Sequence, residues 1–139
     1  EEISYNEIRE LDSCSRLYEQ DLDDLGFSIL GHYKLVTLQT PMLFKVFEHS
    51  VDADYVGVLK VGETSGFSVS TFFKNGAVLT TSPLKMLSNT PNVSDNYYLQ
   101  IFTDLNLNQI YTNHKEAKTY LKNNRQLKPM ELGLKEMIQ

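Results

Sequence analysis

A chain of 139 residues, 41% hydrophobic and 22% charged, has the size and composition of a single globular domain with its own core. Its net charge of −5 argues against non-specific binding to nucleic acid, and no apolar run approaches the ~20 residues that span a bilayer. Cys14 is the only cysteine, so an intrachain disulfide is excluded. The chain begins at Glu1 rather than Met, so we expect that something upstream was processed or cut away, and a lost signal or membrane anchor is one alternative left open.

The first predicted element is a helix that begins after Ser4. Ser4 and Glu7 have the spacing of a capping box, in which each side chain accepts a hydrogen bond from the other residue's main-chain N–H. Gly26 is suited to end this helix, because glycine readily adopts the left-handed conformation that follows many helices. One apolar stripe recurs at helical spacing: Ile8, Leu11, Tyr18, Leu22 and Leu25. We interpret Cys14, at the border of this stripe, as a core residue rather than a nucleophile.

Six candidate strands follow the first helix. Their residues are rich in β-branched and aromatic types, and turn residues separate them. The connections are mostly short, so neighbouring strands are expected to be antiparallel. The longest irregular segment, residues 83–96, is predicted to be a mobile loop. The predicted strands cover residues 27–38, 42–49, 54–61, 67–73, 77–82 and 97–102.

Asn75 and Gly76 lie between two of these runs and give the strongest hairpin signal in the chain. Asn-Gly favours a two-residue type I′ turn, since both central residues then need a positive φ. This turn would pair Phe73 with Val78 and Phe72 with Leu79, and would place the two pairs on opposite faces of the sheet.

A second helix is predicted to begin after Asp104 or Asn106. Its expected buried face consists of Leu107, Ile110, Tyr111, His114, Ala117 and Leu121. Pro129 suits the first turn of a short terminal helix. The fold class predicted for residues 1–139 is therefore a single α+β domain. It has an N-terminal helix, an antiparallel meander of about five to six strands, and C-terminal helices packed on one face.

Several short motifs resemble a pattern found in a family of uncharacterised bacterial proteins. Those proteins read approximately LGFxxLGxY, then HP after an aromatic or aliphatic residue, then FxDGxxLxTT, and later a helix with YxxH. The corresponding segments here are residues 25–33, 47–49, 72–81 and 111–114, with Asn75 where the family often has Asp and Ser50 where it has Pro. Members of that family often carry an upstream hydrophobic segment and have no established activity. The resemblance therefore implies a possible membrane tether, without a mechanism.

The three histidines could form a metal site only if at least two of them, or one with carboxylates, converged on one ion. Pairing of the first two strands about Thr40 would place His32 opposite Glu48, whereas a one-residue slip would place it opposite His49. The sequence leaves both registers open. Asp54 ends a short polar turn, residues 49–54, that could hold a cation or orient a polar ligand, although an ordinary turn is the simpler interpretation. No metal-binding motif or glycine-rich phosphate loop is present, and the sequence predicts neither a metal nor a cofactor.

Acidic residues crowd the predicted C-terminal end of the first helix, where they oppose the helix dipole. They are Glu19, Asp21, Asp23 and Asp24. Residues 1–24 carry nine acidic residues against two arginines, a net charge of −7. Either basic residues of the second helix or a basic partner protein could offset this charge. The intramolecular candidates are Lys115, Lys118, Lys122 and Arg125.

Three functional hypotheses follow. The first is a non-enzymatic domain that binds a basic protein surface or forms the soluble part of a membrane-tethered bacterial protein, because no catalytic constellation can be nominated. The second is a sensor or carrier of a small apolar ligand, in which the sheet and residues 83–96 enclose an aromatic-lined cavity of several hundred Å³. The third, and least favoured, is a metal-dependent or hydrolytic enzyme that uses His32, His49 and Asp54.

Overall fold

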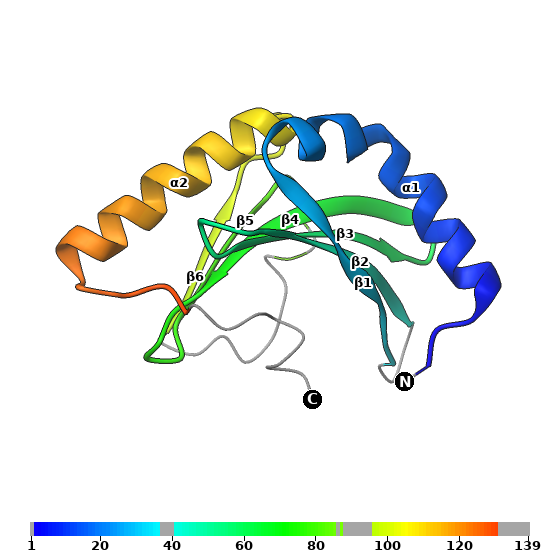
Figure 1. Ribbon diagram of the computed structural model, residues 1–139, viewed down its shortest axis with the longest axis horizontal. Helices are drawn as coiled ribbons and strands as arrows, with labels where there is room; N and C mark the ends of the chain where they lie inside the picture. Colours follow the sequence, from blue (N-terminus) through cyan, green and yellow to red (C-terminus); the bar gives the residue numbers. More distant parts are fainter. Residues whose placement is uncertain (1, 37–40, 86, 88–95, 131–139) are drawn as a thin grey trace.

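The computed structural model describes residues 2–36, 41–85, 87 and 96–130, and it confirms the α+β fold class. Both helices lie on the same face of one curved sheet (Figure 1). The predicted strand boundaries agree with the structure to within a few residues, because alternation and turn residues mark the ends of each strand. The elements in chain order are α1 (Tyr5–Asp24), β1 (Phe27–Leu35), β2 (Met42–His49), β3 (Asp54–Val61), β4 (Thr64–Phe72), β5 (Val78–Ser82), β6 (Tyr97–Ile101) and α2 (Leu107–Asn124).

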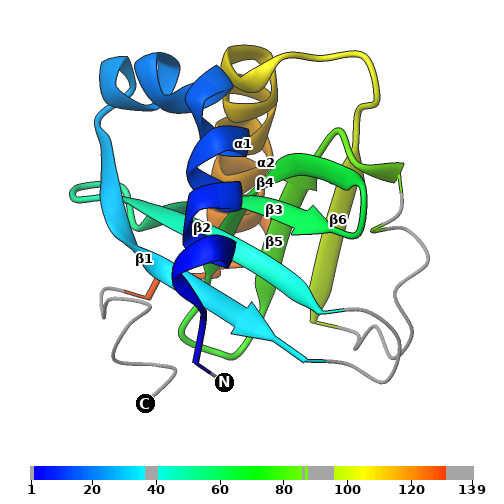
Figure 2. The ribbon, with the colours of Figure 1, turned by 90° about the vertical axis from the view of Figure 1, so that its right-hand side faces the viewer.

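The six strands follow the chain order across the sheet, with β1 and β6 at opposite edges (Figure 2). The first four pairs are antiparallel, as predicted, but β5 and β6 are parallel. The expectation of a wholly antiparallel meander was therefore wrong at its last pair. Parallel neighbours need a crossover of about a dozen residues or more, and residues 83–96 supply that length.

Both helices begin at the predicted caps. Ser4 and Glu7 form the capping box of α1, and Asn106 forms an equivalent box with Gln109 at the start of α2. Gly26 follows α1 with a φ of 93°, the left-handed conformation expected after the helix.

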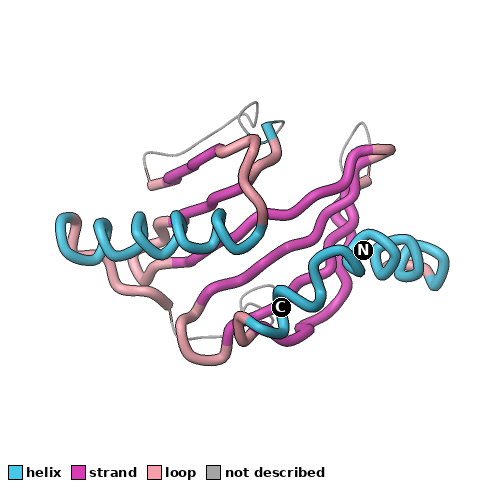
Figure 3. The backbone as a smooth tube through the Cα atoms, turned by 90° about the horizontal axis from the view of Figure 1, so that it is seen from above, coloured by secondary structure: helices cyan, strands magenta, loops and turns pink. Residues whose placement is uncertain are grey.

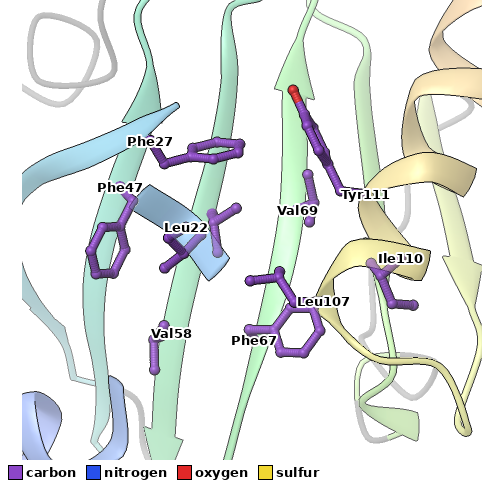
Figure 4. Close-up of a cluster of buried hydrophobic side chains, with 10 residues drawn as sticks. Leu22, Phe27, Phe47, Val58, Phe67, Val69, Leu107, Ile110 and Tyr111 are labelled. Carbon is purple, nitrogen blue, oxygen red and sulfur yellow. The ribbon is translucent and has the colours of Figure 1, made fainter. Parts of the chain in front are cut away.

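The main core lies between the sheet and the two helices. α1 packs on β1, β2 and β3, whereas α2 packs on β4 and β5, so the helices cover different parts of the sheet (Figure 3). Aromatic and aliphatic side chains of the strands point toward residues of both helices (Figure 4). A second, smaller cluster lies under the C-terminal half of α2 and contains Phe73, Ala77, Leu79, Leu121 and Leu127.

The hairpin at Gly76 is present, but its predicted register was wrong by one residue. Phe72 pairs with Val78 and Thr71 with Leu79, whereas the two-residue turn would pair Phe72 with Leu79. Only Gly76 has a positive φ in this turn, at 87°, so the loop spans three residues and ends in a left-handed glycine. Because one residue of slip reverses the faces of a strand, Leu79 lies on the helix side and Val78 on the other.

The register of β1 against β2 also differs from both expected alternatives. His32 pairs with Lys45 rather than with Glu48 or His49. A bulge between Ile29 and Gly31 shifts the pairing along β1, and the strand ends at Leu35 instead of at residue 38.

One helix rather than several follows β6 in the described part of the chain. Where the short terminal helix was expected to begin, Pro129 forms an isolated antiparallel bridge with Phe73, and the Met130 N–H donates to the carbonyl of Phe72. The rest of that predicted helix, at residues 131–139, lies outside the described residues, as does most of the loop predicted at residues 83–96.

Candidate functional site

A groove with a volume of about 700 Å³ lies between α2 and the edge strand β6. Aromatic and aliphatic side chains dominate its lining, and a few amide and charged groups join them. This composition is typical of sites that bind small organic molecules. The lining residues are Leu79, Tyr97, Tyr98, Leu99, Gln100, Phe102, Asn113, Glu116, Ala117, Tyr120, Leu121 and Arg125.

The alternation of β6 and the helical period of α2 form the two walls of this groove. Tyr98 and Gln100 pair with Leu79 and Thr81, which places them on the side of the sheet that faces α2. Asn113, Glu116 and Tyr120 form a second stripe on α2, next to the stripe that faces the core. Tyr120 remains 57% exposed, although it is a large aromatic residue. The groove is therefore open to solvent and presents aromatic surface.

Behind the groove, a largely buried polar network crosses the interface between the sheet and α2. The Thr71 hydroxyl on β4 donates to Asp54 Oδ1 on β3 over 2.6 Å. The two ring nitrogens of His114 on α2 lie 2.8 Å from the hydroxyls of Thr71 and Thr81. Thr81 Oγ1 in turn lies 3.1 Å from Oε1 of Gln100, which also lines the groove. A continuous path of hydrogen bonds thus joins Asp54 to the groove.

Asp54 is the charged centre of this network. It is wholly buried and accepts hydrogen bonds from Tyr111, whose hydroxyl is 2.7 Å from Oδ2, and from Lys118, whose ammonium is 2.9 Å from Oδ1. Lys118 also donates to the carbonyl of Asp52. An ion pair with these additional donors satisfies the carboxylate, which a buried charge requires.

Burial controls the protonation of two groups in this network. The pKa of His114 is lowered from 6.5 to about 4, mainly because burial disfavours the imidazolium, although the nearby Asp54 carboxylate acts in the opposite direction. The pKa of the Tyr111 hydroxyl is raised, first by burial and then by the charge of Asp54. At neutral pH the imidazole is therefore neutral and the phenol is protonated.

The network resembles a catalytic hydroxyl–imidazole–carboxylate arrangement only in its residue types. Asp54, Thr71, Thr81 and His114 are all fully buried, and each hydroxyl and ring nitrogen already has a partner within the network. Among the described residues, no buried side-chain nitrogen or oxygen lacks a hydrogen-bond partner. The network therefore fixes α2 on the sheet. Gln100 is the residue that connects the hydrogen bonds of this network to the groove.

A second polar cluster lies beneath α1. Lys45 on β2 is buried and its ammonium lies 2.8 Å from Asp12 Oδ1 and 3.7 Å from Glu19 Oε1. His32 Nε2 lies 2.9 Å from the same Asp12 oxygen. Hydrogen bonds from Lys45 and then from His32 lower the pKa of the Asp12 carboxyl. The cluster neutralises a buried ammonium at the interface between α1 and the sheet.

The structure does not bring the predicted trio of His32, His49 and Asp54 together. His32 contacts Asp12, Asp54 belongs to the network under α2, and His49 Nδ1 accepts hydrogen bonds from the main chain of the turn after β2. Among the described residues, no group of three or more His, Cys, Asp or Glu side chains could hold a metal ion. The geometry thus offers no shared site for these three residues.

The acidic cluster at the end of α1 is not neutralised by α2. Glu19 lies near Lys45, and Asp24 accepts a hydrogen bond from Gln20. Within the described ranges, Asp21 and Asp23 form no ion pair. Of the two alternatives for offsetting this charge, pairing with basic residues of α2 is not seen among the described residues, and Lys118 contacts Asp54 instead.

Several residues of the groove and of the two clusters were missed by sequence reasoning. Lys45 carried a usable signal, since a lysine within the apolar run of residues 42–47 needs a buried partner. Thr81 and Gln100 carried no comparable signal, because their contact depends on the parallel pairing of β5 with β6.

No protein-family model matches this chain, and neither the curated proteins nor the solved structures contain a match. None of the helices in the described residues is both long enough and apolar enough to cross a membrane. The membrane tether that the bacterial resemblance implies stays a prediction.

Proposed function

We propose that this protein is a non-enzymatic binding domain that takes a small organic ligand with an aromatic or apolar part in the groove between α2 and β6. The observation that carries this proposal is the groove itself. Its volume of about 700 Å³ falls within the range of about 300–1,000 Å³ that is usual for ligand pockets. The cavity expected from the sequence was to involve residues 83–96, most of which lie outside the described residues, and the described lining of this groove comes mainly from α2 and β6.

The groove combines an apolar surface with a few polar groups that can orient a ligand. Tyr98, Phe102 and Tyr120 contribute aromatic rings to the lining, and Gln100 and Asn113 contribute amides. Aromatic rings bind other rings in offset or edge-to-face geometry, which adds about 0.5–1.5 kcal/mol per pair beyond area burial. These rings therefore favour a ligand with an aromatic part.

A substitution that fills the groove tests this proposal. Ala117 lines the groove, so Ala117→Phe places a ring inside it, whereas Thr119→Phe places the same ring on the exposed surface of α2. We expect small aromatic compounds to raise the melting temperature of the wild type and of Thr119→Phe, but not of Ala117→Phe. The proposal fails if no compound stabilises the wild type, or if all three proteins respond equally.

A second proposal retains the basic protein partner. Its supporting observation is that Asp21 and Asp23 form no ion pair within the described residues. Both lie with Asp24 at the C-terminal end of α1, where the helix dipole makes negative charge unfavourable. Pull-down experiments with the wild type and with a variant that carries Asn or Gln at Glu19, Asp21, Asp23 and Asp24 would test it. Recovery of the same partners by both proteins would remove the electrostatic part of this proposal.

A further inference from the structure

The polar groups between Asp54 and the groove form an unbranched chain of hydrogen bonds, in which each hydroxyl has only one hydrogen to donate. The chain of hydrogen bonds runs from Asp54 through Thr71, His114 and Thr81 to Gln100, with successive separations of 2.6, 2.8, 2.8 and 3.1 Å. The direction of donation at one end therefore determines the direction at the other end.

The direction is fixed at the buried end. A carboxylate only accepts hydrogen bonds, so the Thr71 hydroxyl must give its one hydrogen to Asp54 Oδ1. The Thr71 oxygen then has only lone pairs for His114, and Nε2 of His114 must carry a hydrogen to donate to it. The Nε2–H form of the ring follows from Asp54 alone.

A neutral imidazole has one N–H, so its Nδ1 must accept when Nε2 donates. Thr81 then gives its hydrogen to His114 Nδ1 and has only lone pairs left for Gln100. Gln100 must turn its NH₂ group toward Thr81, which leaves its carbonyl oxygen for the groove. The orientation drawn in the structure, with Oε1 of Gln100 toward Thr81, instead requires Thr81 to donate to Gln100 and both ring nitrogens of His114 to donate.

The surroundings of His114 decide between these two states. The ring is fully buried, and the charged groups that face it are Asp54 from β3, 3.9 Å away, and Lys118 from α2. The groups that β4, β5 and β6 contribute to this chain of hydrogen bonds are the uncharged Thr71, Thr81 and Gln100. Burial is the dominant effect and holds the pKa at about 4, so the neutral ring prevails at neutral pH. A half-turn of the Gln100 amide, which leaves its shape almost unchanged, completes this state.

We propose that the groove presents the carbonyl of Gln100 as a hydrogen-bond acceptor and therefore selects an aromatic ligand that carries a ring N–H or a hydroxyl. The inference rests on the proposed function, and it adds the polarity of the ligand. Glu116 is another acceptor in the lining, so a test must separate the two residues.

Indole and 1-methylindole are suitable probes, because they differ at the ring nitrogen and the chain contains no tryptophan. The fluorescence of the probe therefore reports binding to the wild type, to Gln100→Met and to Glu116→Ala. One hydrogen bond of about 1 kcal/mol predicts roughly fivefold tighter binding of indole by the wild type. We expect this preference to disappear in Gln100→Met and to survive in Glu116→Ala.

Two other results of the probe experiment would overturn the inference. Equal binding of both probes by the wild type, or a preference that survives Gln100→Met, overturns the inference and leaves the proposed function intact. Failure of both probes to bind at millimolar concentration overturns the inference, and the groove-filling comparison then decides the proposed function separately.

The tautomer of His114 gives an independent readout that needs no variant. Nitrogen-15 chemical shifts of the wild-type ring at pH 7 should identify the Nε2–H form. An Nδ1–H form or an imidazolium at this pH would overturn the assigned orientation of Gln100, even if indole binds.

Discussion

At the scale of single residues, the burial of Asp54 organises the interface between α2 and the sheet. The sequence marked Asp54 as a candidate and placed His114 on the buried face of a helix, because both inferences depend on local pattern. Their partnership through Thr71 was not predictable, since Thr71 lies 17 positions from Asp54 and 43 positions from His114. Such contacts depend on the register of the sheet, which local patterns leave open.

The first prediction concerns the charge of Asp54. Asp54→Asn leaves the ammonium of Lys118 without a counter-charge in a largely buried place, and breaking a buried ion pair typically costs about 3–5 kcal/mol. We expect a loss of about 3 kcal/mol in the free energy of unfolding, measured by urea denaturation at pH 7. Asp23→Asn is the matched control, since Asp23 is exposed and should change stability by less than about 0.5 kcal/mol. Equal losses in the two variants would contradict this role.

The second prediction concerns pH. The pKa of His114 is about 4 in the folded protein and 6.5 in the reference state, so the unfolded chain binds more protons between these values. The stability associated with His114 is complete above pH 6.5 and is lost as the pH falls toward 4. By linkage, the contribution of His114 to the free energy of unfolding should fall by about 2 kcal/mol between pH 7.5 and 5.

Urea denaturation of the wild type and of His114→Gln across this range measures the effect. His32 and His49 are present in both proteins, so the difference between the two curves isolates His114. Parallel curves would show that His114 does not titrate as its burial requires.

At the scale of the elements, the sequence specified helices and strands better than it specified their pairing. The caps at Ser4 and Asn106 and the alternation of the strands are local signals, and the structure agrees with them. The hairpin register depends on whether the turn holds two or three residues, and Asn-Gly is compatible with both. The Asn75 side chain accepts a hydrogen bond from the Ala77 N–H, a contact that helps to define the three-residue loop.

The third prediction compares two glycines of the sheet. Gly76 has a φ of 87° and open space where a Cβ would lie, so Gly76→Ala tests backbone conformation without a clash. We expect a loss of about 1 kcal/mol, because a left-handed conformation costs other residues roughly 1–2 kcal/mol. In Gly57→Ala the new Cβ would lie an ordinary 3.8 Å from Ser68 Oγ, and stability should be unchanged or higher. Thermal unfolding of both variants measures the contrast, and a larger loss at Gly57 would contradict it.

At the scale of the whole molecule, the two helices divide the sheet between them. α1 covers β1, β2 and β3, and α2 covers β4 and β5, so the edge strand β6 extends beyond the main packing of α2 and helps to form the groove. This arrangement follows from the parallel addition of β6 to β5, which short-range signals did not indicate. The groove could therefore be found only from the assembled fold.

The measurement that tests the binding groove most directly is a nitrogen-15 and carbon-13 NMR titration of the wild type with indole. We expect saturable shifts at Tyr98, Gln100, Ala117 and Tyr120, with little change in β1 and β2. Shifts that cluster instead at the acidic end of α1, or no shifts at millimolar indole, would contradict the assignment of the groove as the binding site.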